Sequence, residues 1–333
     1  MSAPRQRCLF TAPFDFLPAD IVEAYQGTMD VRFGEVWVAS ELEPDPSATA
    51  WVPNPGQNFV IDDRILDLLP ALRVIATPST GRNHIDEAAC VRRGVAVFSL
   101  LDDREVLDTI TASSEFTFLL LLNALRRLDF AVGEVSAGRW RSREDRLRGN
   151  ELSGKRVGIV GFGRNGRRVA RFAQAFDAIV SYYDPYVTSS DAEQWPIERI
   201  FSDSDAVVVC CAFTPETTGM VGASLLERMK QGAVLVNTSR GEVLVESELA
   251  ELLEKRPDLR VAVDVLTGEV TNTHHDSPLL AAHKRGQIVV TPHIAGATVE
   301  SQSKAALASL SALKRFFGAP VPSRGDELVQ HTG

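Results

Sequence analysis

Three charged residues in the second half of the chain, Arg240, Glu269 and His293, are of types that can bind and protonate a small anion. Histidine exchanges protons near neutral pH more readily than other side chains, and an adjacent carboxylate stabilises its cationic form. Arginine is suited to bidentate capture of a carboxylate. Taken singly, each of the three is readily explained as an ordinary loop residue. The interpretation therefore depends on where each residue lies relative to the predicted strands.

Each of the three residues follows a short apolar segment of the kind that forms a buried parallel strand. In open α/β sheets, ligands bind beyond the carboxyl ends of the strands. We therefore predict that the three charged residues form one catalytic site at such an edge. The apolar segments are residues 234–237 before Arg240, 261–265 before Glu269 and 288–292 before His293.

A glycine-rich turn earlier in the chain has the context of a dinucleotide-binding site. The apolar residues 157–160 lead directly into Gly161, Gly163 and Gly166, and a helical pattern follows. The first glycine allows a tight turn, and the second lets a pyrophosphate approach the backbone. The third lets the helix pack close to the strand.

The helical pattern after this turn covers residues 167–173. We count Arg164 and Asn165, within the turn, among the cofactor-binding residues, because N–H groups and the helix dipole face the phosphates there. The next apolar segment ends at Asp184, where a carboxylate can accept the ribose hydroxyls of NAD. No Arg or Lys follows Asp184 before Arg199, so a 2′-phosphate has no evident partner. The pattern favours NAD over NADP.

Strand and helix patterns alternate through both halves of the chain, which predicts an α/β fold with two doubly wound parallel sheets. The polar residues 101–104 separate the halves, and the apolar helix expected over 116–128 is predicted to be buried in a core or a subunit interface. The predicted strands are 7–12, 31–39, 49–52, 72–77, 95–99, 206–211, 234–237, 261–265 and 287–290. The other predicted helices are 21–25, 61–69, 87–93, 225–229, 246–253 and 300–317.

Composition favours a soluble two-domain protein. The chain has 333 residues, 44% apolar and 24% charged, and its net charge of −9 argues against a nucleic-acid or anionic-membrane partner. The four cysteines lack metal-ligand spacing, which predicts no metal site and suits a reducing compartment. No signal peptide is visible, and the longest apolar run, 116–122, is shorter than the ~20 residues of a membrane span. We expect a cytoplasmic protein.

These motifs resemble the D-isomer-specific 2-hydroxyacid dehydrogenase family, which includes phosphoglycerate dehydrogenases, over nearly the whole chain. The resemblance implies that Arg240 holds the substrate carboxylate and oxo oxygen. His293 would be the acid/base, and Glu269 would orient it and stabilise its charge. Besides the glycine turn, the resemblance rests on residues 214–219 (TPETTG), 237–241 (NTSRG), 264–269 (DVLTGE), 291–296 (TPHIAG) and 79–86 (STGRNHID).

The family also implies binding roles outside the catalytic three. Asp264 would bind the nicotinamide carboxamide, and Thr217 counts among the cofactor-binding residues. Backbone N–H groups of Ser79, Thr80 and Gly81 would hold the substrate carboxylate from the other side of a cleft.

The resemblance implies an NAD-dependent enzyme that interconverts a 2-oxo acid and a D-2-hydroxy acid by hydride transfer, as a homodimer. It also implies a flavodoxin-like substrate domain, residues 1–101 and 298–333, that carries an inserted Rossmann NAD domain, residues 102–297. Two other functions stay open. One is an NADH-sensing, corepressor-like binding protein, and the other is oxidation of a phosphite-type anion on the same scaffold.

A basic stretch over residues 138–148 holds five arginines in a chain of negative net charge. It reads either as a solvated loop or, by resemblance, as a segment near the partner subunit's cleft. In the second case Arg141, Arg143 or Arg146 could reach the substrate, and Arg82 could add a further cation. Paired arginines would favour a substrate with a second anionic group.

Overall fold

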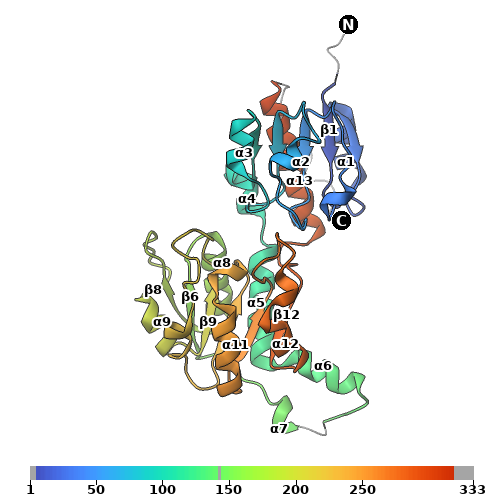
Figure 1. Ribbon diagram of the computed structural model, residues 1–333. Coiled ribbons are helices and arrows are strands. Elements are labelled where there is room, and N and C mark those ends of the chain that lie inside the picture. The colour runs from blue at the N-terminus through green and yellow to red at the C-terminus, as the bar shows by residue number, and fades with distance from the viewer. Residues whose placement is uncertain (1–4, 142–143, 319–333) are drawn as a thin grey trace. The chain divides into compact units, whose positions relative to one another are not determined.

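The computed structural model describes residues 5–141 and 144–318, and the chain forms two compact units (Figure 1). The first unit comprises residues 1–110 and 298–333, and the second comprises residues 111–297. Residues 102–110, which we assigned to the NAD domain, lie with the first unit. The assignment of one substrate domain and one NAD domain stays a prediction at this point.

The first unit is built on a five-stranded parallel sheet with strand order β2-β1-β3-β4-β5, the order of flavodoxin-like folds. Successive strand residues point to opposite faces, so Cys8 and Phe10 pack on one side and Leu9 on the other. The strands are β1 (Arg7–Phe10), β2 (Asp30–Phe33), β3 (Ala50–Val52), β4 (Val74–Ala76) and β5 (Ala96–Phe98). The helices are α1 (Ala19–Thr28), α2 (Asp63–Leu66), α3 (Glu87–Arg92), α4 (Arg104–Thr109) and α13 (Val299–Phe316).

The last helix, α13, completes the core of the first unit although it follows the whole second unit in sequence. Ala306, Leu310 and Leu313 are buried with Ile21 and Tyr25 of α1 in one apolar cluster. The Tyr25 hydroxyl, which is fully buried, donates a 2.7 Å hydrogen bond to the carbonyl of Ala306. The chain therefore returns to the first unit through a helix that its core requires.

The second unit has a seven-stranded parallel sheet with order β12-β11-β10-β9-β6-β7-β8, in which β6 starts the Rossmann arrangement. Helices cover both faces, since Val207 of β9 packs with α9 to α12 and Val208 packs with α5 and α8. The strands are β6 (Arg156–Val160), β7 (Ile179–Tyr183), β8 (Glu193–Gln194), β9 (Ala206–Val209), β10 (Val234–Asn237), β11 (Arg260–Val263) and β12 (Ile288–Val290). The helices are α5 (Ala112–Arg126), α6 (Leu128–Ser136), α7 (Glu144–Leu147), α8 (Arg164–Ala175), α9 (Ile197–Asp203), α10 (Ala223–Leu226), α11 (Glu246–Lys255) and α12 (Pro278–Lys284).

The predicted doubly wound α/β class is confirmed, and the differences lie in the bounds and the number of the elements. The helix predicted over 116–128 is split, because Arg127 adopts a left-handed conformation (φ 55°) between α5 and α6. The basic stretch contains the short helix α7 rather than loop alone. Helices α4, α6, α9 and α12 and the short strand β8 were not predicted. Within residues 5–141 and 144–318, no helix combines the length and apolar character that a membrane crossing needs.

We predict that Tyr25→Phe lowers the free energy of unfolding of the first unit by about 0.5–1.5 kcal/mol, the usual net value of one buried hydrogen bond. Urea denaturation followed by circular dichroism measures this loss. Tyr186→Phe is the matched control, because that side chain is 86% exposed. Equal stability of Tyr25→Phe and wild type would show that the bond to α13 contributes nothing.

Candidate active site

The three predicted catalytic residues follow three neighbouring strands of the second unit. Arg240 follows β10, Glu269 follows β11 and His293 follows β12, and these strands are adjacent and parallel. Nδ1 of His293 lies 2.5 Å from Oε2 of Glu269. The charge of Arg240 also acts on Glu269. The structure therefore brings these three side chains together at one sheet edge.

The Glu269 contact fixes which nitrogen of His293 carries a hydrogen toward it. Burial opposes ionisation of the Glu269 carboxyl, but the hydrogen bond and charge of His293 and the N–H of Leu266 outweigh burial, so the pKa of Glu269 lies below its ordinary value. An ionised carboxylate only accepts hydrogen bonds, so Nδ1 of His293 is the donor. The other ring nitrogen, Nε2, is left for chemistry, and the His293 side chain is 45% exposed.

Asp264, at the end of β11, anchors the loop that carries His293. Its carboxylate is fully buried and accepts from the Thr291 hydroxyl (2.6 Å) and from the N–H groups of Ile294 (3.0 Å) and Ala295 (2.8 Å). Its carbonyl accepts from the N–H of His293 (2.8 Å). Burial raises the pKa of Asp264, although these hydrogen bonds oppose the rise. All these partners lie within one loop, and the predicted contact with nicotinamide stays a prediction.

The backbone of His293 is itself in the left-handed region, with φ 53°. A non-glycine residue adopts this conformation at a cost and keeps it only when surrounding contacts fix it. The bonds from Asp264 supply that constraint.

A second anchor holds the loop of Arg240. The buried side chain of Asn237 donates to the Arg240 carbonyl (2.9 Å) and accepts from both the N–H and the hydroxyl of Ser239. Burial lowers the pKa of Arg240, while the charges of Glu269 and Glu242 oppose the fall. The guanidinium stays charged at any working pH, so it can pair with an anion.

The glycine turn between β6 and α8 leaves room for a pyrophosphate. Gly161 has φ 89°, and a Cβ there would lie 2.4 Å from the Cα of Cys211. A Cβ at Gly166 would lie 2.1 Å from the carbonyl oxygen of Gly161. A Cβ at Gly163, in contrast, would meet nothing within 4 Å. Two glycines are therefore required by the fold, and the third borders open space.

The start of α8 also fits a dinucleotide. Gly163 is the N-cap of α8 and has no side chain of its own that could cap the helix. The Oδ1 atom of Asn165 is buried and has no hydrogen-bond partner among the described residues. Asp184 accepts from the N–H groups of Phe162 (2.8 Å) and Tyr186 (2.9 Å), which places its carboxylate beside the turn. These features match the groups that hold the phosphates and ribose of NAD.

The remaining predicted binding residues have mainly local contacts. The Thr217 hydroxyl accepts from the N–H of Thr214 and donates to the Ala212 carbonyl. Ser79 of the first unit donates to the Gly81 carbonyl (2.8 Å), which shapes the turn through Thr80. Roles of these residues toward cofactor and substrate stay predictions.

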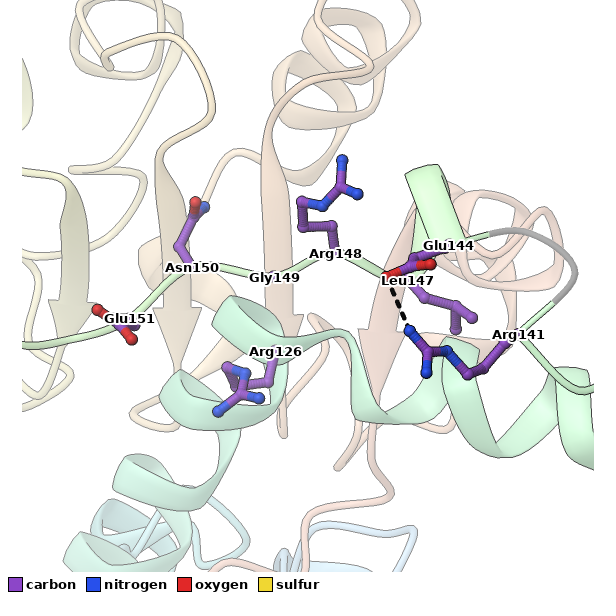
Figure 2. Close-up of a pocket in the computed structure, with 8 residues that line it drawn as sticks. All are labelled: Arg126, Arg141, Glu144, Leu147, Arg148, Gly149, Asn150 and Glu151. Atoms are coloured by element: carbon purple, nitrogen blue, oxygen red, sulfur yellow. Dashed lines mark hydrogen bonds and ion pairs between the residues drawn. The ribbon is translucent and has the colours of Figure 1, made fainter.

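The basic stretch borders a cavity of about 420 Å³ in the second unit, shown in Figure 2. Arg141 pairs with Glu144 (3.1 Å), and Arg126 and Arg148 point away from each other. Arg146 lies over the ring of Phe130, 4.7 Å from its centroid. Arg143 lies outside the described residues. The lining residues are Arg126, Arg141, Glu144, Leu147, Arg148, Gly149, Asn150 and Glu151, which include none of the three predicted catalytic residues.

Sequence reasoning missed residues whose hydrogen bonds support the loops that carry Arg240 and Glu269. The hydroxyls of Thr117 and Thr238 lie 2.6 Å apart and join α5 to the Arg240 loop. Glu242 and Glu246 accept from N–H groups of the turn that leads to Glu269. Carboxylates soon after Arg240 are visible in the sequence, but nothing there indicates that they bind backbone groups of a distant turn.

The site has the features of a known family. Residues 118–295 match the model for the D-isomer specific 2-hydroxyacid dehydrogenase, NAD binding domain. The D-3-phosphoglycerate dehydrogenase of Mycobacterium tuberculosis is 33% identical over 250 residues, which cover 74% of this chain and 45% of that protein. The chain thus spans about half the length of the curated relatives that it matches first.

Two further similarities extend over most of both chains. The glyoxylate reductase of Korarchaeum cryptofilum is 34% identical over 269 residues, covering 79% of this chain and 78% of that protein. A crystal structure of a Thermus thermophilus protein has a TM-score of 0.79 and 28% identity, covering 95% of this chain and 99% of that one. The chain belongs to the D-isomer specific 2-hydroxyacid dehydrogenase family, and its residues 118–295 are an NAD binding domain of that family.

Proposed function

We propose that this protein is an NAD-dependent oxidoreductase that interconverts a 2-oxo acid and a D-2-hydroxy acid. The observation that carries the proposal is the 2.5 Å contact between His293 and Glu269 beside Arg240, in an NAD binding domain. These residues supply an anion-binding group and a proton donor at one edge of a nucleotide-binding sheet. In the proposal, the inserted second unit binds the cofactor and the first unit contributes the substrate turn, Ser79 to Gly81.

The residues of the chain divide the work of reduction. The Arg240 guanidinium binds the carboxylate and oxo oxygen of the acid and draws charge toward the oxygen. NADH, when bound, supplies the hydride to the oxo carbon. His293 gives the proton on Nε2 to the oxo oxygen, and the Glu269 carboxylate stabilises the imidazolium that precedes this step. In the oxidative direction His293 takes the proton back.

The substrate is proposed only as a class. Two of the relatives are a D-3-phosphoglycerate dehydrogenase and a glyoxylate reductase. The substrate in the first name carries a phosphate group, and the substrate in the second name does not. A second anionic group on the substrate stays part of the proposal. Arg82 pairs with Asp102 (2.7 Å) and with Glu87 (3.5 Å), so such a group would have to compete with these carboxylates.

We further propose that the protein works in the cytoplasm as a homodimer and without a nucleic-acid or membrane partner, which the net charge of −9 supports. Helix α6 supports the dimer, because it extends away from the sheet of its unit in Figure 1. Its apolar side chains Leu128, Val132 and Val135 are 54%, 57% and 55% exposed. An exposed apolar face of this kind marks a protein interface.

NAD binding is tested with Gly163→Ala. The methyl group meets open space in the protein, so we expect unfolding stability near that of wild type. It would occupy the position where a pyrophosphate approaches the backbone, so the Kd for NADH should rise at least about tenfold, which is ~1.4 kcal/mol of binding free energy. Gly27→Ala, also in open space, is the control. Unchanged NADH affinity in Gly163→Ala, measured by calorimetry, would refute this reading of the turn.

The reaction is tested by NADH consumption with a panel of 2-oxo acids, followed by chiral analysis of the hydroxy acid. We expect a D-product, and His293→Ala should lower kcat by about 10²- to 10⁴-fold. His283→Ala, on α12, should leave kcat unchanged. NADH binding without turnover of any 2-oxo acid would favour the sensor function, and NAD reduction by phosphite would favour the inorganic alternative.

The pKa of Glu269 predicts how the reaction depends on pH. Because the pKa of Glu269 lies below the ordinary value of a glutamate, its carboxylate takes up a proton only at a pH below that ordinary value. Between about pH 7 and pH 5 the Glu269 carboxylate therefore stays ionised and keeps its contact with His293, so the kcat for reduction should not fall as the pH is lowered over this range. A steady fall in kcat over this range, with the protein folded, would contradict the assigned roles.

The dimer is tested by the double variant Val132→Glu, Val135→Lys, which places charges on the exposed face of α6. Light scattering at about micromolar concentration should give a dimer for wild type and a monomer for the variant. Val91→Lys, on α3 and 78% exposed in wild type, should remain dimeric. A monomeric wild type would remove the homodimer from the proposal.

A further inference from the structure

The turn between β11 and Glu269 is held by the carboxylates of three glutamates. Three successive backbone N–H groups donate to three different glutamates. Leu266 donates to Glu269 itself (2.8 Å), Thr267 donates to Glu246 (2.7 Å) and Gly268 donates to Glu242 (3.3 Å). Charge-assisted hydrogen bonds of this kind are stronger than those between neutral groups. The turn that presents Glu269 is therefore fixed from outside as well as by Glu269.

Glu246 is the best placed of these anchors. Only 8% of its surface is exposed, and its second oxygen accepts from the Ser277 hydroxyl (2.6 Å). The Ser277 oxygen also accepts from the N–H of Leu279, which caps α12. As the first residue of α11, Glu246 lies where the helix dipole favours negative charge. One buried carboxylate thus joins the starts of two helices to the Glu269 turn.

The chain segment that leads into Glu246, residues 240–246, also carries Arg240. A Cβ at Gly241 would lie 2.0 Å from the carbonyl carbon of Leu266 and 2.1 Å from the nitrogen of Thr267, so the two backbones are in direct contact there. Glu246 lies five residues after Gly241 on that segment, and its carboxylate accepts a hydrogen bond from the N–H of Thr267, which belongs to the same peptide. Arg240 and Glu269 are therefore positioned by a single packed unit of backbone.

We propose that Glu246 is a positioning residue, which holds the Glu269 turn so that Glu269 meets Nδ1 of His293. The inference rests on the proposed oxidoreductase function and extends it to Glu246, a buried residue outside the predicted catalytic and cofactor-binding residues. Without Glu246, the N–H of Thr267 loses its acceptor. The turn then keeps the longer hydrogen bond from the N–H of Gly268 to Glu242. Small displacements of a catalytic group are costly, since about 1 Å can reduce a rate 10²-fold.

Three substitutions separate the parts of this role. Glu246→Leu removes both acceptors and should lower kcat by about 10- to 100-fold with little change in the KM for NADH. Glu246→Gln can still accept from Thr267 and donate to Ser277, so it should stay within about threefold of wild type. Glu246→Asp keeps the charge but is too short to span both partners, so it should lose about tenfold.

The matched control lies on the same helix. Glu248 also accepts from a backbone N–H, that of Ala223, but holds α10 rather than the Glu269 turn. Glu248→Leu should therefore keep wild-type kcat even if it lowers stability. If Glu248→Leu and Glu246→Leu reduced kcat equally, the effect of Glu246 would be one of general stability and the proposal would fail.

A double-variant cycle tests whether Glu246 acts through Glu269. In a Glu269→Gln background, Glu246→Leu should cost much less than it does in wild type, because the contact it protects is already altered. The pH profile of kcat for Glu246→Leu should also move toward that of Glu269→Gln. Fully additive losses with an unmoved profile would overturn the positioning role.

One readout does not need turnover and so separates this inference from the proposed function. In histidine-labelled protein, the imidazole ¹⁵N signals of His293, assigned with His293→Ala, should change in Glu246→Leu and remain near wild type in Glu246→Gln and Glu248→Leu. If wild type reduced no 2-oxo acid but showed these changes, only the proposed function would fail. If the His293 signals were the same in all variants, the positioning role would fail.

Discussion

The buried carboxylate of Asp264 is the constraint on which the candidate site depends. The carboxylate accepts hydrogen bonds from the hydroxyl of Thr291 and from the N–H groups of Ile294 and Ala295. The backbone carbonyl of Asp264 accepts a further hydrogen bond from the N–H of His293. A left-handed backbone at a non-glycine residue costs about 1–2 kcal/mol. Four hydrogen bonds at about 1 kcal/mol each outweigh that cost. A buried charge without such partners would instead destabilise the fold.

The site is held from a second side as well. Asp264 fixes the backbone of His293, whereas Glu269 fixes its ring, and Glu269 depends on a turn that packs against the segment after Arg240. The groups assigned to chemistry are thus separate from the groups assigned to support. Asp264, Asn237 and Glu246 are buried and hydrogen-bonded, while His293 is exposed where it can act. Rigid support of this kind reduces the reorganisation that a reaction would otherwise require.

Sequence reasoning reached the fold class and the proximity of Arg240, Glu269 and His293 because both follow from local patterns. Strand runs and the glycine turn signal their structure within a few residues, and the carboxyl ends of neighbouring parallel strands share one edge. It missed the break at Arg127, which a single left-handed residue imposes on an otherwise helical pattern. It also missed the support by Glu242 and Glu246, since a bond between a side chain and a distant peptide leaves no periodic signal. The role of Asp264 toward the cofactor, which the resemblance implies, stays a prediction, and the sequence did not indicate its hydrogen bonds to the His293 loop.

The return of the chain to the first unit has a consequence for biosynthesis. Residues 111–297 are continuous, so we expect the second unit to be able to fold as soon as it has left the ribosome. The first unit is made earlier, yet its apolar cluster lacks Ala306, Leu310 and Leu313 until the last helix is synthesised. Protease digestion of stalled nascent chains would test this order, with early protection of the first unit as the contrary result. The first unit is thus expected to mature after the second unit, because α1 and its sheet complete their core only when α13 has been synthesised.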